Sequence, residues 1–412
     1  MANTSLLPLL ASLLAFSAPV LGGSRVWEAP LHHTVQLAPI EHVPVDAAGY
    51  AIVDNATEAA LTKRYLSINP GAGTSPIKLW PDKTISYCFD SLESKDKLGD
   101  YLLLAIASWN SATLLDTEYK WKRVHEPGPS CTNSRQRDRI LVISYNEDDI
   151  LATTVGLPPL NANEPEYKGP SMRLSTADNV GQLSVTANVA HEIGHAWGLY
   201  HEHQNRHFWT YPYGGHTSDF SGGDVFGANF DCTALKDYNT VRGKIAEKHG
   251  ATSPQAQELY RLICTEQRAA ATWHFSAADW LPIVSPTQGS HGVPVVGATY
   301  EHVDWQSIML YPSGAGGTGT ARPITNPSDD PDAFDQRTPV LRRNDGQKIY
   351  PNAVPSQGDV AGIRRLYEAA DYGSNQGKGF IENLPNEKKN PRFAKFMRDF
   401  LKKKDKSCPA PE

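Results

Sequence analysis

The stretch from His191 to His201 constrains this chain more than any other segment, because it carries three histidines at spacings that suit one metal ion. His191 and His195 are four residues apart, so on a helix both imidazoles project from the same face. Apolar residues on another face of the same helix would anchor it in a core; they are Val185, Val189, Ile193 and Trp197.

Gly198 predicts where this helix ends, because glycine tolerates the left-handed backbone that closes many helices. A reversal there would bring His201 back toward His191 and His195 as a third nitrogen ligand. Three protein ligands and one open position are typical of a catalytic zinc site, whereas a structural site is closed by a fourth side chain. The sequence therefore predicts one zinc ion on these histidines, with Glu192 able to reach a water molecule at the open position.

Together with a later methionine, these residues resemble the metzincin clan of zinc metallopeptidases. Residues 307–311 read Ser-Ile-Met-Leu-Tyr and are similar to the methionine turn of that clan, in which Met309 would form an apolar floor beneath the ligands. Ser307 and Tyr311, two residues before and after the methionine, are similar to the astacin family within the clan. Glu202, directly after the third histidine, fits the same family.

The resemblance implies an α+β, metzincin-like fold with a twisted mixed β-sheet, long helices and a cleft between N- and C-terminal subdomains. It implies an endopeptidase in which Glu192 moves the proton of the attacking water and Tyr311 stabilises the oxyanion. Protein or peptide substrates would bind in extended form along a strand at 171–175, at the cleft edge. The chain departs from the family pattern at Asn205 and His207, where the family has an arginine and an aspartate.

A second interpretation is a secreted, non-catalytic binding or adhesion protein that keeps the zinc helix as a structural element. Glu192 separates the two, because a structural site has no need of a base beside its first ligand. Met309 could also be core filler, and Tyr311 a packed aromatic behind the turn. His203 and His207 are not expected to bind the metal, because three histidines complete the protein's share of the coordination.

Residues 1–22 are expected to form a secretory signal peptide, because their apolar run is too short and too poorly flanked for a transmembrane anchor. Residues 23–64 are expected to form a removable propeptide that ends at the dibasic pair Lys63–Arg64, and a surface charge pair is the equal alternative for these two residues. The remaining parts are a zinc metallopeptidase catalytic domain at 65–371, an insertion within it at about 208–298, and a basic tail at 372–412.

The mature protein is expected to be exported, soluble and monomeric. The net charge of -6 and the pI near 6.2 argue against nucleic acid as the main partner. No second long apolar stretch follows the first, so no transmembrane segment is expected. Five cysteines suit an oxidising compartment, with Cys88–Cys131 and Cys232–Cys264 as the expected disulfides and Cys408 left over.

Apolar periodicity predicts the elements of the catalytic domain. They are strands at 79–89, 140–145, 154–156 and 172–174, and helices at 98–109, around 236–249, around 254–264 and from Gly358 onward. In the last helix Asp359 would be the N-cap. The glycine-rich segment 313–320 is expected to be a mobile loop beside the substrate pocket.

Overall fold

The computed structural model describes residues 78–110, 118–160, 167–205, 208–213, 225–283, 300, 303–323 and 330–371. The predicted signal peptide, propeptide and basic tail lie outside these residues, as do His207 and Cys408. Within the described residues the fold is mixed, with one mixed β-sheet and several helices, which is compatible with the expected α+β class. None of the helices described is long and apolar enough to cross a bilayer.

Five strands form the sheet in the order β2-β1-β3-β5-β4. Their bounds are β1 Thr84–Phe89, β2 Lys120–Arg123, β3 Leu141–Tyr145, β4 Ala152–Thr153 and β5 Ser171–Leu174. The first four in the spatial order run parallel, and β4 runs antiparallel to β5. The sequence patterns found β1, β3 and β5 but not β2, whose four residues are mostly basic and carry one buried side chain, that of Trp121.

The expectation that residues 171–175 form the edge strand is wrong for this sheet. β5 lies inside it, because β4 runs back along the side of β5 that does not face β3. The strand predicted at 154–156 is displaced as well, since those residues follow β4. Among the strands described, β2 forms one edge of the sheet and β4 therefore forms the other. Just beyond it, the backbone N–H of Gly156 donates to the carbonyl of His195 over 2.9 Å.

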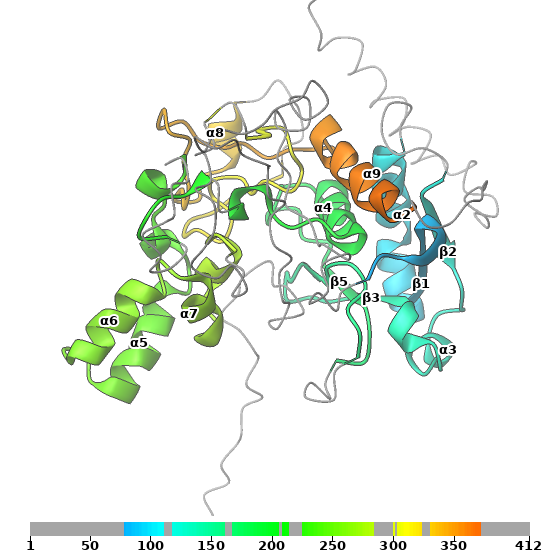
Figure 1. Ribbon diagram of the computed structural model, residues 1–412, viewed down its shortest axis with the longest axis horizontal. Coiled ribbons are helices and arrows are strands. Elements are labelled where there is room, and N and C mark those ends of the chain that lie inside the picture. The colour runs from blue at the N-terminus through cyan, green and yellow to red at the C-terminus, as the bar shows by residue number, and fades with distance from the viewer. Residues whose placement is uncertain are drawn as a thin grey trace, which may run out of the picture.

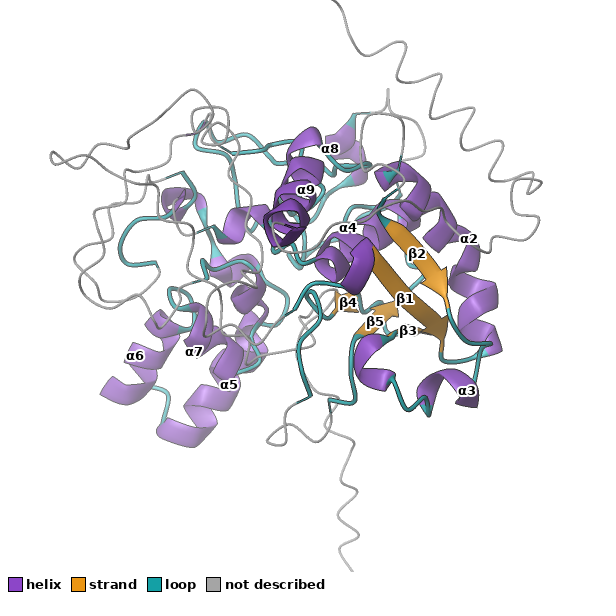
Figure 2. Cartoon of the chain, turned by 45° about the vertical axis from the view of Figure 1, so that its right-hand side comes forward, coloured by secondary structure: helices purple, strands orange, loops and turns teal. Residues whose placement is uncertain are grey.

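The helices are α2 Leu92–Trp109, α3 Pro129–Thr132, α4 Val185–Trp197, α5 Tyr238–His249, α6 Pro254–Leu262, α7 Gln267–Thr272, α8 Pro331–Phe334 and α9 Gln357–Asp371. Helix α2 starts earlier than predicted because Ser91 caps it, its hydroxyl accepting from the N–H of Ser94 over 3.0 Å. Trp109 at its end donates from Nε1 to the carbonyl of Ala190 over 2.9 Å. That bond fastens α2 to α4, and Figure 2 shows both helices close to the strands.

Both expected disulfides are present. Cys88–Cys131 joins β1 to α3, and Cys232–Cys264 closes the segment that contains α5 and α6. The two helices predicted in this segment are confirmed as α5 and α6. In Figure 1 they lie side by side at the lower left, on the far side of the molecule from the sheet.

The glycine-rich segment differs from its prediction in its first half. A mobile loop is expected there, whereas residues 313–317 are buried. A Cβ on Gly317 would lie 2.2 Å from the carbonyl oxygen of Thr338, so only glycine allows the two backbones to approach so closely. The glycines here serve packing.

Asp359 is not the N-cap of α9, because the helix begins at Gln357. Ser356 precedes the helix, and its hydroxyl accepts from the N–H of Asp359 over 3.0 Å while the Asp359 carboxylate accepts from the N–H of Ser356 over 2.8 Å. This reciprocal pair is a capping box. The same carboxylate accepts from the hydroxyl of Ser307 (2.5 Å) and the N–H of Ile308 (2.9 Å), which ties α9 to the methionine turn.

The buried carboxyl of Asp359 should make stability depend on pH. Burial raises the pKa of Asp359 from 3.8 to about 6. A carboxyl whose pKa is higher in the folded chain than in the unfolded chain stabilises the fold below pH 3.8, and that contribution is lost as the pH rises through about 6. Relative to Asp359→Asn, we expect the wild type to lose about 2–3 kcal/mol of unfolding free energy between pH 4 and pH 7.

Urea unfolding of the two proteins at several pH values measures this difference. Other titrating groups contribute to both proteins and cancel in the comparison. The raised pKa of Asp359 would be contradicted if the difference in unfolding free energy between the two proteins stayed constant with pH. It would also be contradicted if the wild type became relatively more stable as the pH rises.

Candidate metal site

Helix α4 carries the first two histidines and ends where the sequence predicts. Gly198 has φ 109° and ψ 13°, in the left-handed region. Its N–H donates to the carbonyl of His195 over 2.9 Å, and the N–H of Leu199 donates to the carbonyl of Gly194 over 3.0 Å. These two bonds form a Schellman motif, which satisfies the last carbonyls of the helix and reverses the chain. The reversal carries His201 back toward α4.

The three predicted histidines come together in the interior. The candidate ligand atoms of His191, His195 and His201 all lie within 4.8 Å of one another, and each of the three residues is at most 4% exposed. The Nε2 atoms of His195 and His201 are 3.0 Å apart. Among the residues described, this is the group of histidines, cysteines and carboxylates that could hold a metal ion.

Each of the three imidazoles turns its Nδ1 atom toward an oxygen. The pairs are His191 with the carbonyl of Ile308 (2.7 Å), His195 with the carbonyl of Leu199 (2.8 Å) and His201 with Oε1 of Gln204 (2.8 Å). A carbonyl oxygen only accepts, so in each pair Nδ1 must carry the proton and donate it. The Nε2 atom of each ring then holds a lone pair, which is the form that binds a metal.

This arrangement of lone pairs fits a metal ion. Two neutral imidazoles that point lone pairs at each other over 3.0 Å repel unless a cation lies between them. A tetrahedral zinc ion with Zn–N bonds of about 2.0–2.1 Å holds its nitrogens about 3.3 Å apart, close to the observed separation. Three neutral imidazoles suit zinc and also other divalent transition metals, so the geometry supports a metal site more strongly than it selects the metal.

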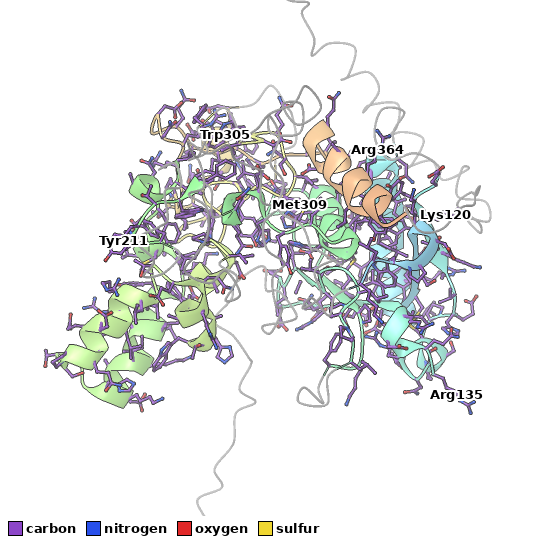
Figure 3. The ribbon with its side chains drawn as sticks, viewed as in Figure 1. Lys120, Arg135, Tyr211, Trp305, Met309 and Arg364 are labelled. Atoms are coloured by element: carbon purple, nitrogen blue, oxygen red, sulfur yellow. A yellow bond between two sulfur atoms is a disulfide. The ribbon has the colours of Figure 1, made fainter. Side chains whose placement is uncertain are left out.

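Met309 lies against α4, as an apolar floor requires. Figure 3 shows it in the middle of the molecule beside this helix. A Cβ built on Gly194 would lie 2.3 Å from the sulfur of Met309 and 3.4 Å from Cζ2 of Trp109. The glycine between the two helical histidines therefore makes room for the methionine. The carbonyl of Met309 also accepts from the N–H of Glu202 over 3.0 Å, which joins the methionine turn to the segment that carries His201.

The two predicted catalytic residues lie beside the histidines. Glu192 follows His191 in α4 and is fully buried. Tyr311 is also fully buried, and its ring centre lies 4.1 Å from that of His201 and 5.7 Å from that of His191. Trp280, from the predicted insertion, packs edge-on against Tyr311 at 5.0 Å. The structure thus places the Tyr311 ring against the histidine rings and buries Glu192 next to His191 in α4, and the chemical roles of both residues stay predictions.

His203 and Glu202 lie next to the third histidine but bind other partners. The Nε2 atom of His203 lies 2.9 Å from the carbonyl of Asp279, and its ring stacks on His201 at 5.3 Å. The Glu202 carboxylate accepts from the N–H of Asp304 over 3.2 Å. Burial, with a smaller effect from the charge of Asp304, raises the pKa of Glu202 well above its usual value. Neither residue belongs to the candidate metal group.

Sequence reasoning missed the residues that orient the ligands. Gln182 donates from Nε2 to the carbonyls of Ile308 (3.2 Å) and Leu310 (3.0 Å), which fixes the turn that faces His191. Gln182 and Ile308 are 126 residues apart in the sequence, so no local sequence pattern indicates this contact. Gln204 follows His201 by three residues, a spacing that could have suggested a contact within one turn.

The contact between Gly194 and Met309 predicts a specific pattern of stability changes. We expect Gly194→Ala to destabilise the chain by about 1–3 kcal/mol, because the added methyl group overpacks the space filled by the sulfur. Combining it with Met309→Ala should cost less than the sum of the two single changes, since the second change removes the clash. Urea unfolding of the four proteins in the cycle measures the coupling.

Gly243→Ala is the matched control. Gly243 lies inside α5 and a Cβ there meets nothing within 4 Å, so the same substitution should stabilise the chain by about 0.5–1 kcal/mol. Additive effects at Gly194 and Met309 would contradict the proposed packing.

Comparison with models of known protein families and with curated protein sequences found no match.

Proposed function

We propose that this chain is a secreted, astacin-like zinc metalloendopeptidase of the metzincin type. The observation that carries the proposal is the convergence of His191, His195 and His201, with Nδ1 of each ring facing an acceptor oxygen so that Nε2 is the nitrogen that can bind an ion. In the described part of the chain no cysteine, carboxylate or fourth histidine joins this group. A structural zinc site is closed by a fourth protein ligand, so a three-ligand group supports catalysis.

In the proposed mechanism the histidines hold the ion through Nε2. A bound zinc ion would supply a Lewis acid that acidifies water and polarises the scissile carbonyl. Glu192 accepts the proton of the attacking water and delivers it to the leaving amine. Tyr311 donates a hydrogen bond to the oxyanion of the tetrahedral intermediate.

Substrates are proposed to be proteins or peptides that bind in extended form. An extended peptide can add to a free sheet edge as a further strand. β4 is one edge of the described sheet, but its two residues are buried, so β4 is not exposed for a substrate strand. The two disulfides support an oxidising, extracellular location, and we expect the active form to be a monomer.

Burial of the site favours one alternative, a secreted binding protein with a structural zinc ion. The three histidines are at most 4% exposed, and Glu192 and Tyr311 are fully buried. A protease must admit a peptide to these groups, whereas a structural site has no such need. Activity measurements separate the two proposals.

The test uses the exported chain after cleavage behind Arg64, with casein as substrate. We expect digestion that stops with a chelator and returns with zinc. Glu192→Ala should lower the rate by at least about 10²–10⁴-fold, because it removes the proton acceptor, while the zinc content stays at one ion per chain. Casein digestion and metal analysis of the same preparations measure both quantities.

Glu247→Ala, on α5 and outside the histidine group, is the control and should digest at the wild-type rate. If Glu192→Ala digests as fast as the wild type, the proposed mechanism is wrong. A wild-type chain that holds zinc and cleaves nothing would favour the structural alternative.

A further inference from the structure

Gln204 connects the third histidine to a distant segment of the chain. Its Oε1 atom lies 2.8 Å from Nδ1 of His201, and its Nε2 atom donates to the carbonyls of Ala278 (3.0 Å) and Leu281 (3.3 Å). The backbone adds a further bond, since the N–H of Ile283 donates to the carbonyl of Gln204 over 3.0 Å. The side chain is buried, with 4% exposure, so these bonds are shielded from water.

The two backbone carbonyls decide how the amide of Gln204 is oriented. Only the NH₂ end can donate to Ala278 and Leu281, so the oxygen end must face His201. That oxygen accepts, which forces the proton of His201 onto Nδ1 and leaves the lone pair on Nε2. The Nε2 atom is the one that lies 3.0 Å from Nε2 of His195. The amide therefore fixes the metal-binding form of the ring.

Among the three histidines, His201 is the one whose Nδ1 atom donates to a side chain rather than to the backbone. His191 and His195 donate to main-chain carbonyls, which a substitution cannot remove. His201 also lies outside α4, so the helix does not hold its ring in place. The position of the third ligand thus depends on a group that mutation can change.

We propose that Gln204 is a positioning residue that holds His201 in its metal-binding tautomer and fastens this ligand to residues 278–283 of the insertion. The inference rests on the metal binding in the proposed function and not on its proteolytic step. It also gives the insertion a role, because the carbonyls that orient the amide belong to it. The binding affinity of the site then depends on a segment far from the zinc helix in sequence.

The experiment compares zinc dissociation constants of the full chain and two substitutions at one position, by competition with a chromophoric chelator. Gln204→Met keeps the size of the side chain and removes both polar ends, and we expect zinc to bind about 10–100-fold more weakly. Gln204→Glu keeps an oxygen acceptor for His201 and loses the donor to the insertion. It should bind zinc at least about 10-fold more tightly than Gln204→Met.

Asn146→Leu is the matched control for loss of a side-chain amide. Asn146 is half-buried, and its amide donates to the carbonyls of Ile150 and Leu174 rather than contacting a histidine ring. The substitution should lower the unfolding temperature and leave the zinc affinity of the folded chain unchanged. A purely structural role for Gln204 predicts that Gln204→Met, Gln204→Glu and Asn146→Leu all behave alike, which would overturn the proposal.

A nitrogen-15 NMR spectrum of the zinc-loaded wild type provides a second measurement that does not depend on Gln204→Met folding. We expect a protected Nδ1–H resonance from His201 that shifts in Gln204→Glu. Binding of zinc through Nδ1 of His201 would refute the proposal. Zinc affinities equal in the wild type and Gln204→Met would refute the role of Gln204 alone, whereas a wild-type chain that binds no zinc would refute the proposed function as well.

Discussion

The candidate metal site depends on three hydrogen bonds, which the Nδ1 atoms of His191, His195 and His201 donate. A buried imidazole must satisfy both of its nitrogens, and an Nδ1 that donates to a fixed oxygen leaves Nε2 as the free lone pair. The three acceptors come from separate segments: the methionine turn, the loop that follows α4, and the side chain of Gln204. The lone pairs converge only when the fold brings these segments together.

Much of the surrounding structure serves to hold those acceptors. The carboxylate of Asp359 accepts from the start of the methionine turn and completes the capping box of α9, so one group positions both the turn and this helix. Gln182 donates to the carbonyls on either side of Met309. Helix α4 is fixed to α2 through Trp109, and its close contact with Met309 depends on Gly194.

The features that depend on the spacing of residues close together in the sequence could be predicted. The pattern from His191 to His201, with Gly198 as the helix end, was enough to predict a helix, its reversal and three converging nitrogens, and both disulfides followed from cysteine positions. Contacts between distant segments were not predictable. β4 took the sheet edge that was assigned to residues 171–175, because strand order depends on pairing and not on periodicity. The role of Gln204 depends on carbonyls of the insertion, which have no sequence signature.

Zinc K-edge X-ray absorption of the purified, exported chain tests the metal site most directly. We expect one zinc ion per chain, with three imidazole nitrogens at about 2.0–2.1 Å and one further oxygen that no protein side chain supplies. Replacement of His201 by alanine should reduce the imidazole count to two. A zinc ion with sulfur or a fourth protein ligand, or a chain that retains no metal, would contradict the central claim that three oriented histidines form an open metal site.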